Sequence, residues 1–130
     1  MRALDTNILV RLLVEDDPDQ VRIAKLLLEE PALVGSGVLM ETAWVLRSTY
    51  KQPRTAIAAA LLALLDVPTI HVVDEAQVRW AIGRYRDHGA DLADMLHIVA
   101  AKGASRFASF ERHLAAQAGE GSPLPVERPV

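Results

Sequence analysis

Apolar residues recur every three to four positions along most of the chain, which is the spacing of one face of a helix. Residues 6–14 show this pattern in Ile8, Leu9, Leu12 and Leu13. Prolines, glycines and capping residues divide the rest of the chain, because Asp before Pro favours a helix start and Gly favours a helix end. The sequence therefore predicts helices over 6–14, 18–30, 37–50, 53–65, 74–88, 92–102 and 111–117.

Short apolar segments lie between these helices and predict strands, the clearest of them over 69–73. The others cover 2–5, 32–34 and 106–108, with an edge strand over 124–126 flanked by prolines. Strands that alternate with helices indicate an α/β fold, which we expect to be a three-layer α/β/α sandwich around a short, mostly parallel sheet. The 130 residues fit one domain, 1–130.

The composition is that of an ordinary globular protein, with 51% hydrophobic and 24% charged residues. The absence of cysteine excludes disulfides, zinc–thiolate sites and thiol nucleophiles. The N-terminus lacks a signal-peptide pattern and the apolar run over 56–65 is too short to span a bilayer, so we expect a cytoplasmic protein. The net charge of −3 lacks the basic excess typical of nucleic-acid-binding proteins, although bound cations would offset part of the acidic charge.

Two acidic residues in the first third of the chain are candidates for chemistry. Asp5 lies at the carboxyl end of the first predicted strand, where α/β proteins bind their ligands. It could equally cap the following helix. Glu41 shares a helical face with Val38, Trp44 and Val45, which is a largely apolar stripe. A buried carboxylate there needs a basic partner, a proton or a metal, whereas a partly exposed helix edge would need none of these.

Three further acids lie in the last third. Asp91 and Asp94 are three residues apart at a helix start, so they share a face. The alternative is that Asp91 is the N-cap and Asp94 a first-turn acid favoured by the helix dipole. Glu111 follows Ser109 and Phe110 just past a predicted strand, and could be a ligand or a solvated side chain.

The order and spacing of these acids resemble the PIN-domain nucleases, and in particular the VapC-like toxins of type II toxin–antitoxin systems. The similarity covers essentially the whole chain. Each motif alone is unspecific, but four motifs in register are specific. The matching segments are Asp5-Thr6-Asn7, Glu41, Asp91-Leu92-Ala93-Asp94-Met95-Leu96-His97 and Ala108-Ser109-Phe110-Glu111-Arg112.

The resemblance implies a role for each matching residue. The catalytic acids would be Asp5, Glu41, Asp91, Asp94 and Glu111. Asp5, Glu41 and Asp94 would be the main metal ligands, and Asp91 and Glu111 would bind a second ion or hold waters. The family usually has an aspartate where Glu111 stands, so this chain departs from the pattern there by one methylene. The supporting residues would be Thr6, Asn7 and Ser109.

Carboxylates are hard oxygen ligands that suit Mg²⁺ or Mn²⁺, and a bound dication would relieve their mutual repulsion. The resemblance implies an endoribonuclease that hydrolyses RNA to leave a 5′-phosphate and a 3′-hydroxyl. It also implies an antitoxin partner and a homodimer. Two alternatives remain open: a non-toxin PIN nuclease that processes RNA or acts on DNA, and a non-catalytic PIN-like binding module. An aspartyl-phosphate phosphatase is disfavoured because Asn7 stands where a second aspartate is needed.

Two basic clusters could contact an RNA backbone. One comprises Arg47, Lys51 and Arg54, and the other lies just before Asp91 and comprises Arg84, Arg86 and His88. Ordinary solvated faces would explain each of these residues as well. The helix over 56–65 is apolar on every side, which suggests a subunit interface.

Overall fold

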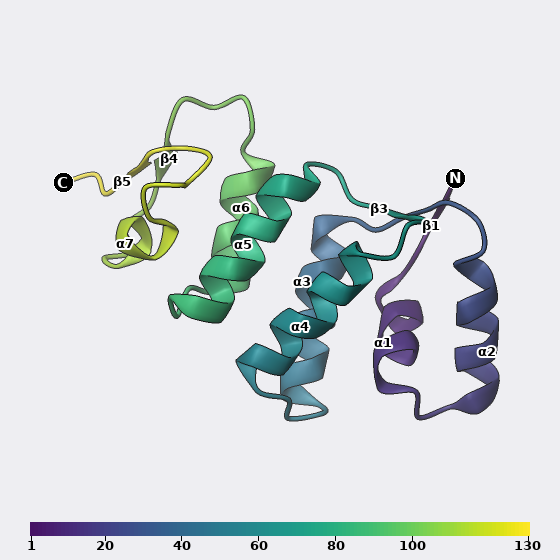
Figure 1. Ribbon diagram of the computed structural model, residues 1–130. Coiled ribbons are helices and arrows are strands. Elements are labelled where there is room, and N and C mark those ends of the chain that lie inside the picture. The colour runs from purple at the N-terminus through teal and green to yellow at the C-terminus, as the bar shows by residue number, and fades with distance from the viewer. The chain divides into compact units, whose positions relative to one another are not determined.

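The computed structural model describes all 130 residues, in seven helices joined by strands of two residues each (Figure 1). The helices are α1 (Thr6–Val14), α2 (Pro18–Leu27), α3 (Ser36–Ser48), α4 (Arg54–Leu65), α5 (Glu75–Asp87), α6 (Leu92–Ala100) and α7 (Leu114–Ala118). The strands are β1 (Arg2–Ala3), β2 (Ala32–Leu33), β3 (Ile70–His71), β4 (Phe107–Ala108) and β5 (Val126–Glu127).

The chain forms two compact units, Met1–Glu75 and Ala76–Val130, called here the N-terminal and C-terminal units. Each has its own parallel strands and its own helices. The predicted α/β class with parallel strand pairing is confirmed. The expectation of one domain over 1–130 stays a prediction. No helix combines the length and the apolar character that crossing a membrane requires.

The N-terminal unit is built on a parallel sheet in the order β1-β2-β3. A helix pair connects each strand to the next, α1 and α2 first, then α3 and α4 (Figure 1). Helix α1 packs against both α2 and α3, and α3 packs against α4. The ladder continues past β1, because the Leu4 amide donates to the Leu33 carbonyl at 2.9 Å. The next residue, Asp5, therefore lies at the carboxyl edge of this sheet.

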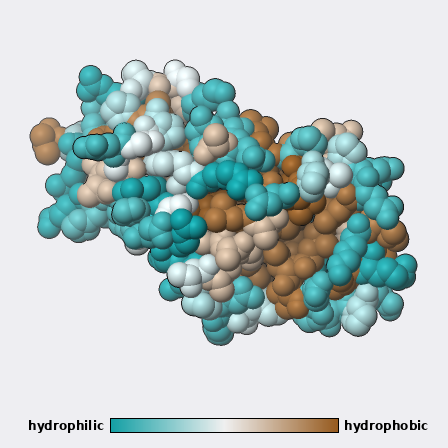
Figure 2. All heavy atoms as spheres, in the orientation of Figure 1, coloured by the Kyte–Doolittle hydropathy of each residue, from teal (hydrophilic) through white to brown (hydrophobic).

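Large aliphatic side chains from four helices form the core of this unit, among them Leu9, Leu39, Leu46 and Leu61, none more than 1% exposed. Figure 2 shows hydrophobic residues gathered on the viewed face between α4 and α2, bordered by hydrophilic ones. Helix α4 buries Ile57, Leu61, Leu64 and Leu65, leaves Leu62 half-buried and exposes Ala56, Ala59 and Ala63. Its exposed side is therefore apolar as well, and the expectation that it marks a subunit interface stays a prediction.

The C-terminal unit contains α5, α6 and the parallel pair β4–β5, in which Phe107 pairs with Val126. Arg84 on α5 ties α7 to this unit: its Nε donates to the Gln117 carbonyl at 2.6 Å and its Nη2 to the Ala116 carbonyl at 3.1 Å. These carbonyls belong to the last turn of a helix, which lacks internal donors for them. Gly119 follows with φ +74, and a Cβ there would lie 2.7 Å from Arg84 Nη2.

Three predicted boundaries are wrong for local reasons. Helix α2 ends at Leu27 rather than near residue 30, because the Leu28 and Glu29 amides bond three residues back and tighten the last turn. Helix α7 begins at Leu114 rather than 111. The last strand is Val126–Glu127 rather than 124–126, since Pro125 has no amide to donate and offers only its carbonyl, to Phe107 at 2.9 Å.

Candidate active site

Asp5 lies just after the extended segment that contains β1, and it is the N-cap of α1. Its Oδ1 accepts a hydrogen bond from the Thr6 amide at 2.7 Å. Capping was one of the two readings of Asp5 from sequence, and it is confirmed. The second carboxylate oxygen makes no hydrogen bond and the residue is exposed. The capping role therefore leaves half of the carboxylate available to a ligand.

Glu41 lies on α3 and is exposed, so the prediction of a buried carboxylate is wrong. The reason is that the apolar stripe around Glu41 is itself largely uncovered. Trp44, which shares the stripe, is 67% exposed, and Val38 and Val45 are only half-buried. The next residue, Thr42, is the one that points into the core, with its hydroxyl donating to the Val38 carbonyl at 2.7 Å. Glu41 thus needs no buried partner, and its significance depends on what lies next to it.

Asp5 and Glu41 line the same pocket, which has a volume of about 250 Å³ and is formed entirely by the N-terminal unit. The structure thus brings together two carboxylates that are far apart in sequence. The pocket is hereafter called the acid pocket. Its other walls are Thr6, Asn7, Val10, Arg11, Val45, Thr49 and Tyr50. Two of the three predicted supporting residues, Thr6 and Asn7, line the same pocket as the carboxylates, and their supporting role stays a prediction.

The sequence interpretation missed Arg11 and Tyr50. Arg11 is one helical turn after Asn7, so helical spacing could have placed it on the side of α1 that faces the pocket. Tyr50 comes from the segment after α3, and no sequence pattern connects it with Asp5.

Asp91 and Asp94 occupy the first turn of α6. Asp91 is the N-cap, and its Oδ1 accepts from the Asp94 amide at 3.0 Å. Burial raises the pKa of Asp94 above its ordinary value, and the negative charge of Asp91 raises it further. His97 opposes this shift, and Glu111 adds to it. Asp94 is therefore the acid whose ionised form this unit destabilises most clearly, as expected where carboxylates gather.

Glu111 is held at the start of its loop by Ser109. The Ser109 hydroxyl accepts from the Glu111 amide at 3.0 Å, and the Ser109 amide bonds to the Glu127 carbonyl on β5. Arg128 fixes the intervening residue, since its Nε donates to the Phe110 carbonyl at 3.1 Å. This turn keeps Glu111 out of α7 and explains the late start of that helix. Ser109 therefore fixes the backbone at Glu111, while its predicted supporting role stays a prediction. The charge of Glu111 is close enough to influence Asp94.

The family model of the PIN domain matches residues 2–119. The chain belongs to the PIN-domain family. No curated protein and no solved structure matches it. PIN domains are typically nucleases that use divalent metal ions, so membership supports a metal-dependent nuclease with a nucleic-acid substrate.

The acids of this PIN domain fit a hard divalent cation in their chemistry. Every candidate ligand is a carboxylate, and the chain has no cysteine. Neither unit by itself gathers three Asp, Glu or His side chains in a metal-binding arrangement. The N-terminal unit supplies the pair in the acid pocket, Asp5 and Glu41. The C-terminal unit supplies the interacting set of Asp91, Asp94 and Glu111.

The predicted basic residues of the PIN domain divide into two groups. Arg84 is committed to the α7 carbonyls, and Arg86 forms a bidentate pair with Asp87 at 2.9 Å. The fixed geometry of Arg84 disfavours the phosphate role considered for it from sequence. Arg47 and Lys51 are exposed and remain candidates.

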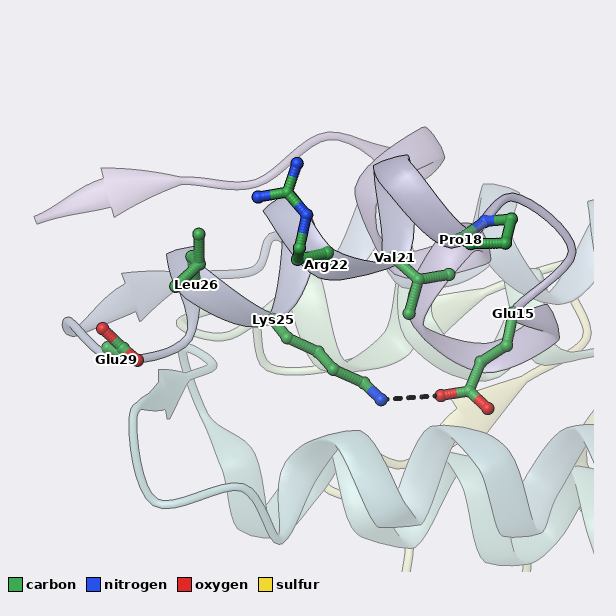
Figure 3. Close-up of a pocket in the computed structure, with 7 residues that line it drawn as sticks. All are labelled: Glu15, Pro18, Val21, Arg22, Lys25, Leu26 and Glu29. Carbon is green, nitrogen blue, oxygen red and sulfur yellow. Dashed lines mark ion pairs between the residues drawn. The ribbon is translucent and has the colours of Figure 1, made fainter.

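A larger hollow of about 520 Å³ lies along α2 and contains none of the predicted site residues. Figure 3 shows the side chains that line it, with Lys25 directed toward Glu15, and the ion pair between Lys25 Nζ and Glu15 Oε1 measures 3.0 Å. Its charges are already paired or of mixed sign, and it offers no cluster of oxygen ligands. The acid pocket, although smaller, is the part of the N-terminal unit that fits the chemistry of a PIN nuclease.

Proposed function

We propose that this PIN domain is a metal-dependent endoribonuclease of the VapC-like toxin branch, which hydrolyses RNA phosphodiester bonds with Mg²⁺ or Mn²⁺. The observation that carries the proposal is the acid pocket, where Asp5 and Glu41 lie together with one free carboxylate oxygen on Asp5. The family match supports the nuclease class, and the resemblance of the ordered motifs supports the toxin branch.

The proposed metal ligands are Asp5, Glu41 and Asp94, with Asp91 as a further ligand and Glu111 as a catalytic acid near Asp94. A bound dication would polarise the phosphoryl oxygens and lower the pKa of an attacking water. Asp5 must keep its capping bond to the Thr6 amide, so it would offer its other oxygen. A bound ion would favour the ionised form of Asp94, because its charge would offset the neighbouring negative charges. Ser109 holds the loop that carries Glu111.

Single-stranded RNA is the proposed substrate class. Two exposed aromatic side chains directly neighbour the acids: Trp44 is 67% exposed one helical turn after Glu41, and Phe110 is 78% exposed just before Glu111. Unpaired bases stack on such rings. The toxin assignment also entails an antitoxin that covers the acids, and a cytoplasmic location. A homodimer is proposed with support from the exposed hydrophobic face between α4 and α2 (Figure 2).

The test is cleavage of total RNA and of a labelled single-stranded RNA by the purified full chain. We expect cleavage with MgCl₂ or MnCl₂, none with excess EDTA, and none by Asp5→Asn or Asp94→Asn. Products should carry a 5′-phosphate, which a 5′-phosphate-dependent exonuclease will detect. Cleavage that survives EDTA and both substitutions would overturn the metal mechanism.

The alternative functions give different results in cleavage and growth assays. A DNA-acting PIN nuclease would cleave single-stranded DNA faster than RNA of the same sequence. A non-catalytic module would bind RNA without cleaving it in any metal. A processing nuclease would not arrest growth when expressed alone, whereas a toxin would, and a short co-transcribed neighbouring reading frame would relieve that arrest.

A further inference from the structure

The acid pocket contains a cation as well as two carboxylates. Arg11 on α1 lines the same cavity as Asp5 and Glu41, and so does Tyr50. The side chain of Arg11 is 30% exposed, so it lies partly in the wall and partly in contact with solvent. Hydrogen bonds to Tyr50 and the negative charge of Asp16 raise the pKa of Arg11, which keeps it charged at every pH of interest.

The guanidinium is held in place on two sides. Its Nε donates to Gln20 Oε1 at 2.7 Å, and its Nη1 donates to Asp16 Oδ1 at 2.7 Å. Tyr50 completes the arrangement, because its hydroxyl accepts from Nη1 at 3.4 Å and donates to Asp16 Oδ2 at 3.0 Å. Nη2 makes no hydrogen bond within the protein. Arg11 thus contributes to the pocket wall, and its guanidinium is oriented by three side chains with Nη2 left unused.

An arginine in this state suits one kind of ligand. Guanidinium N–H groups match the geometry of phosphate oxygens, and a guanidinium that is already oriented loses little conformational freedom on binding. Two carboxylates in the same cavity repel a phosphate unless a cation is also present. On the basis of the function proposed above, we propose that Arg11 is a substrate-positioning residue that binds a backbone phosphate of the RNA strand at the acid pocket. Tyr50 and Asp16 orient it.

The same contacts also join three segments: α1, the start of α2 and the end of α3. A purely structural role would therefore predict lost stability and no specific effect on RNA binding. The two roles separate in the salt dependence of binding, since a phosphate contact releases counterions and a distant structural bond does not.

The experiment measures binding of a fluorescent single-stranded RNA of twelve nucleotides to the full chain by anisotropy, from 50 to 300 mM KCl. The protein carries Asp5→Asn, which should prevent cleavage, and the titrations are made in EDTA. Arg11→Gln is compared with Arg22→Gln, an exposed arginine on α2 outside the acid pocket. Arg11→Lys keeps the positive charge but lacks the planar guanidinium with its several N–H donors. Thermal unfolding of each variant, measured separately, reports any structural loss.

We expect Arg11→Gln to weaken binding about tenfold at low salt and to reduce the slope of log K against log salt by about 0.7, the value for one phosphate on a single strand. Arg22→Gln should change neither, and Arg11→Lys should restore most of the slope. If the salt-dependence slope of RNA binding were the same for Arg11→Gln as for Arg22→Gln, the proposal would be overturned, whatever the melting temperature of Arg11→Gln. If the wild-type chain cleaves RNA normally in that case, the proposed nuclease function stands without this contact. If it neither binds nor cleaves RNA, both fall.

Discussion

Substitution of Asp5 separates the structural role of its carboxylate from its proposed metal role. Asparagine retains an oxygen that can accept from the Thr6 amide, now at 2.7 Å, and Asn and Asp are equally good N-caps. Alanine removes the acceptor, which costs about 1 kcal/mol of stability. For a chain of this length that corresponds to a fall of about 4 °C in Tm. Without metal, Asp5→Asn should therefore melt close to the wild type and Asp5→Ala about 4 °C below it.

Addition of metal should separate the melting temperatures of the wild type and Asp5→Asn. A ligand at a hundred times its Kd stabilises the folded state by about 2.7 kcal/mol, or about 10 °C on the same scale. The Tm of the wild type should rise by this amount in MgCl₂, whereas the Tm of Asp5→Asn should rise little because the variant has lost a metal ligand. RNA cleavage by Asp5→Asn should fall by more than about a hundredfold, since even residues that only support a ligand contribute ten- to a hundredfold.

The matched control is Asp17, the N-cap of α2, whose carboxylate accepts from the Gln20 amide at 3.1 Å. Asp17→Ala should lower Tm by a similar amount, yet leave the MgCl₂-induced gain and the cleavage rate unchanged. The assay is thermal unfolding by circular dichroism in EDTA and in MgCl₂, paired with RNA cleavage. If Mg²⁺ raised the Tm of Asp5→Asn as much as that of the wild type, Asp5 would be a cap and nothing more.

Three further predictions concern the C-terminal unit. Burial and nearby carboxylates raise the pKa of Asp94, so the folded metal-free protein binds a proton at Asp94 more tightly than the unfolded chain does. The free energy of unfolding that this proton contributes is present below about pH 4 and is lost as the pH rises through the pKa of the folded state. Asp94→Asn should flatten this dependence in urea unfolding measured from pH 4 to 8 in EDTA, and an unchanged slope would refute it. Arg84→Ala should cost about 1–3 kcal/mol in the same assay through its lost bonds to α7, whereas Arg86→Ala should be neutral; equal losses would contradict the tie. Ser109→Ala should slow RNA cleavage more than Ser48→Ala, whose hydroxyl bonds only the Trp44 carbonyl, and equal rates would remove Ser109 from the site.

Local signals predicted the helices that begin and end with strong backbone preferences. Helix α1 runs over Thr6–Val14 as predicted, because an N-cap aspartate and a clear apolar period define it together. Helix α2 begins at Pro18 directly behind the capping Asp17, as predicted, whereas α4 begins at Arg54, one residue after Pro53. The regular strands span two residues each, although single ladder bonds continue past them, from the Leu4 amide to the Leu33 carbonyl and from the Val34 amide to the His71 carbonyl.

The sequence could predict only those features of the site that depend on one helix or one strand at a time. A helical wheel correctly grouped Glu41 with Trp44, but it could not reveal that nothing covers that face, so the predicted burial is wrong. The pocket shared by Asp5 and Glu41 depends on the packing of α1 against α3, which ordered motifs anticipate and periodicity does not. The bonds among Arg11, Asp16 and Tyr50 connect segments up to 39 residues apart, and no local pattern encodes them.

The most direct test of this account is anomalous diffraction from Mn²⁺-containing crystals of the full chain. We predict a Mn²⁺ peak about 2.1 Å from carboxylate oxygens of Asp5 and Glu41 in the acid pocket, a distance typical of small hard cations. Mn²⁺ bound only elsewhere on the surface would contradict the claim that these two carboxylates hold the metal.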